Sequence, residues 1–464
     1  MDLFKHFIKS SILYLLGSVL SKLIGFILLP VLTNYLYPDQ LGYYDVANTY
    51  LNLVTTFLFL DIYVGIMRFI YDCHSFDDSL KPIFNGILIF LISLSIYTVL
   101  AFIIYLIADI PYFVYVYIYG VSIVFNNLFG YIARAFKRNK LFAFSGIIAT
   151  LFTAAINFIG LVCFKADISI LYISSIVGLT VQILVIEYHL SIVKKLSRKL
   201  FDKQLFVQLY KYSFPLCLNS LAFWLLTGYG NIMISNYLGL DQNGIYLVAI
   251  KFALVINLAS MCFNLAWQEI VFEKSNENKS YLDSMYTRST GMLINFLSLF
   301  VLCLIPFSFF VFPYMVGKEY DAAFDLIPLS IFSASLSVIS GFLGQIYAAL
   351  KKTSIILYST AAAAFVNIIC LPCFIHYFSI KGAFYSLIIS YLVNLFMRFY
   401  LIRSTVLIQL NYKFILLFLI LLSFSFVIYY KGDLYLNLVG LVLLGGGLLY
   451  NQRKIWYSLI KKTI

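Results

Sequence analysis

Three charged side chains lie deep inside stretches of the sequence that are apolar enough to cross a membrane. They are Lys22, Asp61 and Lys251. A charge at the centre of a bilayer costs roughly 2.5–3.5 kcal/mol on insertion scales, so such a residue normally faces a water-filled cavity or a partner. Lysines in a cavity suit an anionic ligand. A deep carboxylate either pairs with a basic residue or takes up a coupling proton.

Further polar residues share the predicted helices of these charges. The helix predicted for 43–69 places Asp61 and Arg68 on one face, and the helix predicted for 244–268 carries a polar stripe beside Lys251. The candidate substrate-binding residues are therefore Lys22, Asp61, Arg68, Lys251, Asn257, Asn264 and Gln268. The alternative is structural, because long basic side chains can extend to the membrane surface. Arg68 would then be an ordinary arginine at a helix end.

No catalytic or metal-binding pattern accompanies these residues. The seven cysteines lie mostly in apolar runs, and Cys370-x-x-Cys373 has no second pair with which to complete a zinc site. The four histidines are far apart in the sequence. A nucleotide-binding loop of the type Gly-x-x-x-x-Gly-Lys-Ser/Thr is absent from the sequence. We therefore expect no cofactor, no metal and no enzymatic activity, and a gradient of H+ or Na+ as the energy source.

The elements that position these residues must be membrane-spanning helices. Of the 464 residues, 62% are hydrophobic and 11% are charged, and the mean hydropathy is +0.95. Soluble proteins are nearer half apolar and a quarter charged. Because a helix of about 20 residues crosses the hydrocarbon core, the sequence predicts about fourteen spans. These are 11–33, 43–69, 83–107, 112–133, 141–164, 168–190, 212–237, 244–268, 289–312, 324–349, 353–375, 382–402, 412–430 and 434–450.

The lysines and arginines predict the topology independently. With the N-terminus in the cytoplasm, only Lys165, Lys318, Lys381 and Lys431 face outside, and two lysines lie in mid-span, so that 26 of the 32 basic residues are cytoplasmic. This distribution is the positive-inside pattern. It predicts a multi-pass protein of the cell membrane with both termini in the cytoplasm. Because the charge is spread over short loops, it does not indicate nucleic-acid binding.

A repeated segment divides the chain into two halves. Residues 34–44 and 236–246 are identical at seven of eleven positions with a constant offset of 202. Six predicted spans separate the copies, and an even number gives both halves the same orientation. Asp39 and Asp241 within the copies are expected to shape a turn or cap the next helix.

The repeat predicts an all-α integral membrane protein in which two parallel six-helix lobes surround a central cavity, followed by two C-terminal helices. The expected parts are an N-lobe with helices 1–6 (1–193), a basic cytoplasmic linker (194–211), a C-lobe with helices 7–12 (212–405), and two additional helices with a basic tail (406–464).

Several short segments carry a family pattern. They are Tyr14-Leu15-Leu16-Gly17 through Leu29-Pro30, the stretch from Tyr37 to Asp45, Leu60-Asp61 to Arg68-Phe69, the stretch from Phe263 to Gln268, and Ile380 to Phe384. Together they resemble the Wzx-type flippases of polysaccharide repeat units, in the multidrug/oligosaccharidyl-lipid/polysaccharide exporter superfamily. The resemblance implies a V-shaped pair of helix bundles and a substrate carried on undecaprenyl pyrophosphate. It also implies basic cavity residues on helices 1, 2 and 8, where helices 1 and 8 carry Lys22 and Lys251.

We therefore expect a flippase that moves an anionic, lipid-linked repeat unit of O-antigen, capsule or exopolysaccharide to the outer leaflet by alternating access. Membrane lipids and the polysaccharide polymerase machinery are the expected partners. Two alternatives stay open. An ion-coupled multidrug or cation antiporter of the same superfamily would prefer acidic cavity residues. A membrane glycan polymerase or ligase would need a larger external loop than the one around 317–324, which contains no His or Arg.

Overall fold

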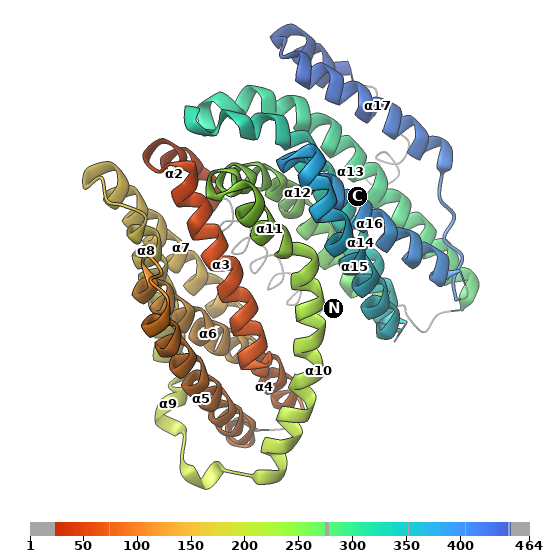
Figure 1. Ribbon diagram of the computed structural model, residues 1–464. Helices are drawn as coiled ribbons and strands as arrows, with labels where there is room; N and C mark the ends of the chain where they lie inside the picture. The colour runs from red at the N-terminus through yellow and green to blue at the C-terminus, as the bar shows by residue number, and fades with distance from the viewer. Residues whose placement is uncertain are drawn as a thin grey trace. The chain divides into compact units, whose positions relative to one another are not determined.

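The computed structural model describes residues 24–443 and residue 446, apart from positions 74, 274–277, 351 and 404. This part of the chain consists of helices and connecting loops and has no β-strand (Figure 1). It contains ten helices that are long and apolar enough to cross a membrane, or twelve if each of two bent pairs counts as one span. The all-helical membrane fold is confirmed. Fourteen spans stay a prediction, because the stretches 11–33 and 434–450 lie partly outside the described residues.

The described residues form two compact units. Unit 1 contains the described residues up to Leu36 and then Tyr43–Ile232, and unit 2 contains Tyr37–Gly42 and the described residues from Met233 onward. The first turn of the helix α3 (Pro38–Phe59) therefore belongs to unit 2, and the rest of that helix belongs to unit 1. The basic segment 194–211, predicted as a linker, packs with unit 1 throughout.

Unit 1 is built around a short helix, α4. Its helices are α2 (Leu29–Tyr35), α3 (Pro38–Phe59, from Tyr43), α4 (Ile62–Ile70), α5 (Phe76–Ile107), α6 (Phe113–Ala135), α7 (Asn139–Phe158), α8 (Ser169–Leu190), α9 (Ile192–Lys195), α10 (Lys203–Thr227) and the first part of α11 (Tyr229–Leu238). The central helix α4 packs against α5, α6 and α10. Glycine allows the close approach that such packing needs: the backbone of Gly86 in α5 lies against Ile66, and Gly65 in α4 lies against the hydroxyl of Ser213.

The connection before α10 is fixed to unit 1 by one buried amide. Asn85 of α5 donates from Nδ2 to the carbonyl of Leu200 at 3.0 Å, and its Oδ1 accepts the N–H of Asp202 at 3.0 Å. Asp202 in turn caps α10 by accepting the N–H groups of Gln204 and Leu205. These bonds explain why this charged stretch takes one course over the end of the bundle.

Unit 2 contains longer helices. They are the last part of α11, α12 (Leu240–Glu273), α13 (Lys279–Met315), the 3-10 helix η3 (Lys318–Leu326), α14 (Ile327–Ala349), α15 (Thr353–Phe378), α16 (Ile380–Ile402) and α17 (Tyr412–Lys431). The helix α14 is its most buried span and packs against α12, α13 and α16, while α15 covers α16. The helix α17 packs on α13.

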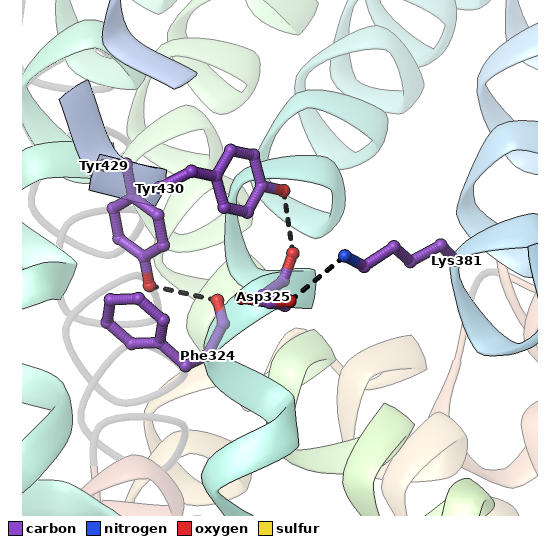
Figure 2. A network of polar contacts seen from close by, with 5 residues as sticks. All are labelled: Phe324, Asp325, Lys381, Tyr429 and Tyr430. Atoms are coloured by element: carbon purple, nitrogen blue, oxygen red, sulfur yellow. Dashed lines mark hydrogen bonds and ion pairs between the residues drawn. The ribbon is translucent and has the colours of Figure 1, made fainter. Parts of the chain in front are cut away.

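The loop predicted around 317–324 folds into η3, which anchors α17 (Figure 2). The hydroxyl of Tyr429 donates to the carbonyl of Phe324 at 3.1 Å, and that of Tyr430 donates to the carbonyl of Asp325 at 2.8 Å. The side chain of Asp325 pairs with Lys381 of α16 at 3.0 Å. Since the two aromatic rings of Phe324 and Tyr429 also stack at 4.4 Å, the network joins η3, α16 and α17 at one end of unit 2.

The repeated segment forms a reciprocal helix crossing inside unit 2. Each copy starts a helix, α3 or α12, and places its aspartate in the first turn, where a negative charge stabilises the helix end. A Cβ atom added at Gly42 would overlap the carbonyl oxygen of Leu240, and one added at Gly244 would overlap that of Pro38. With the offset of 202, Pro38 corresponds to Leu240 and Gly42 to Gly244, so each copy makes the same contact with the other.

Candidate functional site

The second predicted span is not one helix but two. The helices α3 and α4 meet at a bend of 52°, and the break falls at Leu60 and Asp61, whose φ angles are 55° and 49°. Two consecutive non-glycine residues in the left-handed region are costly, at about 1–2 kcal/mol each. The span predicted for 43–69 is therefore present as a bent pair, and the sequence, which has no glycine or proline at the break, does not mark the bend.

Asp61 is buried at this break, with 7% of its surface exposed. Its Oδ1 accepts a hydrogen bond from the hydroxyl of Tyr63 at 2.9 Å, and its Oδ2 accepts one from the hydroxyl of Ser220 at 2.6 Å. Tyr63 belongs to α4 and Ser220 to α10, so the carboxylate connects two helices of unit 1. Within the described part of the chain, no Lys or Arg side chain forms an ion pair with it.

A row of rings leads from Asp61 towards the end of α6. The ring of Tyr63 packs on that of Tyr131 with centroids 4.9 Å apart, and the guanidinium of Arg134 lies 3.9 Å from the centroid of Tyr131. A cation over an aromatic face is a favourable contact. The positive charge of Arg134 is thus separated from the carboxylate by two aromatic rings.

A second polar cluster lies on α3 in unit 1. Asn231 of α11 donates from Nδ2 to Asp45 at 2.7 Å and to the hydroxyl of Thr49 at 3.0 Å. The indole N–H of Trp224 donates to the carbonyl of Thr49 at 3.1 Å. The Oδ1 atoms of Asn48 and Asn231 are buried and accept no hydrogen bond from the described residues. One face of α3 is thus polar from Asp45 to Thr49.

The predicted site residues are divided among different surroundings. Lys22 lies outside the described residues. Lys251 and Asn257 are half-buried on α12 in unit 2. Asn264 and Gln268 also lie on α12, but their side chains fall outside the described part of the structure. In unit 1 Asp61 is buried at the start of α4, whereas Arg68, in the last turn of the same helix, is exposed and pairs with Asp72 at 2.6 Å.

Sequence reasoning missed the hydrogen-bond partners Tyr63 and Ser220, because an isolated tyrosine or serine in an apolar stretch is common. It also missed Arg398 of α16, which was counted with the cytoplasmic arginines but has only 4% of its surface exposed. Its guanidinium donates to the hydroxyls of Ser359 at 3.0 Å and Thr360 at 3.2 Å, and to the carbonyl of Ser340. The absent side chain of Gly344 leaves room for it, since a Cβ there would lie 3.1 Å from Nη1.

Buried single charges with neutral partners, on broken helices, are typical of transport proteins. Residues 7–267 match the family described as "Polysaccharide biosynthesis protein". The chain belongs to this family. No curated protein sequence matches the chain.

Solved structures with the same fold include flippases and drug transporters. The chain is similar to the lipid II flippase MurJ in an inward closed conformation, with a TM-score of 0.71 and 16% identity over 97% of this chain and 99% of that chain. It is also similar to an inward-facing multidrug resistance MATE family transporter of the MOP superfamily (TM-score 0.64, 13% identity, 84% of this chain and 94% of that chain). The Vibrio cholerae MATE transporter VcmN has a TM-score of 0.55 and 17% identity over 87% of this chain and 98% of that chain. At these identities the likeness shows the fold.

Proposed function

We propose that the protein is a flippase that carries an undecaprenyl-pyrophosphate-linked oligosaccharide repeat unit from the cytoplasmic to the outer leaflet of the cell membrane. The observation that carries the proposal is the family membership of residues 7–267 together with the fold, which matches the lipid II flippase over nearly the full length of both chains. An O-antigen, capsule or exopolysaccharide unit is the substrate that fits both.

The physical task fits the residues of the chain. A sugar phosphate cannot cross hydrocarbon unaided, since each unpaired polar group costs several kcal/mol there. Lysines within the membrane lower that barrier for a pyrophosphate, and Lys22 and Lys251 are the residues we assign to it. Asn257, Asn264 and Gln268 supply amides for sugar hydroxyls on the same helix as Lys251. Arg68, exposed at the end of α4, would meet the headgroup as it enters.

The test is a deletion strain in which lipid-linked oligosaccharide is assigned to each leaflet by an impermeant glycan-modifying reagent. We expect substrate to accumulate in the cytoplasmic leaflet and surface glycan to be lost. Lys22→Ala should lower flipping by on the order of ten-fold or more, which corresponds to about 1.4 kcal/mol, and Lys22→Arg should retain more activity. Lys81→Ala, which changes an exposed lysine of α5, is the matched control. Normal flipping in Lys22→Ala would remove Lys22 from the site.

A drug or cation antiporter is the second candidate, favoured by the likeness to MATE transporters and by the buried carboxylate of Asp61. It predicts that the deletion strain keeps its surface glycan and becomes sensitive to cationic drugs. Because the two functions predict opposite phenotypes in one strain, the same experiment separates them.

A further inference from the structure

We propose that a hollow at the end of α8 binds the headgroup of an anionic phospholipid, and that Lys194 contacts its phosphate. The inference goes beyond the proposed function and does not depend on it. Lipid binding is measured on the purified protein without any cargo, so the two proposals fail separately.

The hollow follows from a sharp turn in the backbone. Directly after α8, Ser191 has a φ angle of 50°, in the left-handed region, and the short helix α9 begins at the next residue. The carboxylate of Glu187 holds this turn by accepting the N–H groups of Ile192 at 3.1 Å and Val193 at 2.9 Å. The last turns of α8 and the side chain of Lys194 then enclose an open space of about 570 Å³. Figure 1 shows α9 at one end of unit 1, followed by the connection to α10.

The walls of the hollow change from apolar to charged along the direction of α8. This helix has 22 residues, which at 1.5 Å per residue gives a length of roughly 33 Å, enough to cross the hydrocarbon core. Leu184 and Val185 belong to the span and form the apolar part of the wall, whereas Lys194 lies beyond its end. A phospholipid has the same order, with acyl chains in the hydrocarbon and the phosphate at the surface. The basic residues predict that this surface is the cytoplasmic one.

Lys194 is the cation of the hollow that is available to a ligand. Its side chain is exposed, and no described carboxylate pairs with it. The one carboxylate in the wall, that of Glu187, already accepts two backbone N–H groups. The neighbouring Lys195 is engaged with the bundle, because its Nζ lies 4.3 Å from the ring centroid of Phe76 and 3.5 Å from the carbonyl oxygen of Leu190.

The segment that follows the hollow adds positive charge in a fixed place. Arg198, Lys199 and Lys203 are all exposed. Asn85 fixes the course of this segment by its bonds to the backbone, and the carboxylate of Asp202 is used as the cap of α10. A cluster of basic residues directly beside a span attracts anionic lipids, and each residue near the surface strengthens binding about five-fold.

Two rings in the wall are of the kind that lies at the level of lipid headgroups. Tyr188 is 83% exposed, and its ring meets that of His189 edge to face with centroids 5.5 Å apart. The Nδ1 atom of His189 hydrogen-bonds to the carbonyl of Val185 at 2.8 Å, which fixes the ring against α8. Amphipathic rings are enriched at the membrane–water interface, so this pair places the hollow at the depth of the headgroups.

Native mass spectrometry of the purified full-length protein tests the assigned cation. Given equal amounts of phosphatidylglycerol and phosphatidylcholine, the wild-type protein should retain phosphatidylglycerol preferentially. Lys194→Ala should weaken this binding about five-fold, as expected for one lysine at the membrane surface. Lys81→Ala is the matched control, because it removes an exposed lysine of α5 that does not line the hollow, and it should bind as the wild type does. Equal losses in the two variants would show diffuse attraction and overturn the site.

A second pair of variants tests the hollow without changing any charge. Leu184→Trp places a larger ring in the wall and should weaken phosphatidylglycerol binding several-fold. Leu106→Trp alters an exposed leucine of α5 outside the hollow and should have no effect. Unchanged binding in Leu184→Trp overturns the inference. It is also overturned if undecaprenyl phosphate binds in a Lys194-dependent manner and phosphatidylglycerol does not compete with it, because the hollow would then receive the carrier of the cargo.

Discussion

Adding one methyl group to either repeated glycine should separate α3 from α12. The new Cβ of Gly42→Ala would overlap the carbonyl of Leu240 and lie 2.9 Å from the N–H nitrogen of Gly244. These neighbours are backbone atoms, which no rotamer change can move. Overpacking of this kind costs about 1–3 kcal/mol, whereas the helical preference of alanine over glycine returns at most about 1 kcal/mol.

A buried hydrogen bond raises the cost if the helices part. Asn243 is fully buried and donates from Nδ2 to the carbonyl of Gly42 at 3.2 Å, and leaving such a group unpaired costs roughly 1–3 kcal/mol. We therefore expect Gly42→Ala and Gly244→Ala each to lower the unfolding free energy by about 2 kcal/mol. The double variant should lose little more than the worse single variant, because the first substitution already opens the crossing that the second would disturb.

The assay is reversible unfolding in mixed micelles, followed by far-UV circular dichroism. Gly341→Ala in α14 is the control, because a Cβ at that glycine meets nothing within 4 Å, and it should be neutral or slightly stabilising. Equal stability of Gly42→Ala and Gly341→Ala would refute the reasoning about close approach. Strict additivity in the double variant would refute the reciprocal contact.

Three further results are expected. Arg398→Met should cost less than about 2 kcal/mol in an unfolding titration, since its partners are neutral and no opposite charge is left buried; a larger loss would show that the guanidinium holds α14 to α16. Asp325→Asn should change the unfolding free energy by no more than about 1 kcal/mol, because its pair with Lys381 is half-exposed, whereas Tyr429→Ala should cost about 3–5 kcal/mol by removing a buried ring. Hydrogen bonds from Ser169, and then from Tyr112, lower the pKa of Asp167 in the loop before α8. The charged Asp167 therefore stabilises the folded protein above the pKa that it has in the unfolded chain, and this stabilisation is lost as the pH falls through its pKa in the folded protein. Unfolding at a series of acidic pH values should show this loss in the wild-type protein and not in Asp167→Asn.

The helical architecture could be predicted because it follows from composition. A span needs only a sufficient number of apolar residues, and the predicted stretches 168–190 and 382–402 coincide closely with α8 and α16. Local residue types also mark where helices begin: Asp202 caps α10, and Pro30 lies in the first turn of α2. These features depend on residues that are close in sequence and on the solvent around the chain, so a single sequence is enough to predict them.

The candidate site could be predicted only in part, because it depends on contacts between distant residues. Asp61 was identified by its cost within a membrane, but its partner Ser220 is 159 residues away. The break at Leu60 has no breaker residue, and tertiary contacts hold it. The burial of Arg398 could not be predicted, because its position near a helix end resembles that of an interfacial arginine, and only the packing of α14 and α15 on α16 shows that it is buried.

The two halves of the chain share a scaffold but differ where the chemistry is placed. The glycines that correspond in the repeat make the same contact, yet the position that corresponds to Asp61 is Phe263, with the same offset of 202. The helix α12 continues through Phe263 without a break, and this ring packs on Phe342 of α14 with centroids 5.9 Å apart. The bend at Asp61 is therefore not a requirement of the repeated fold. Within the described part of the repeat it belongs to unit 1, where Asp61 stands in place of a packed ring.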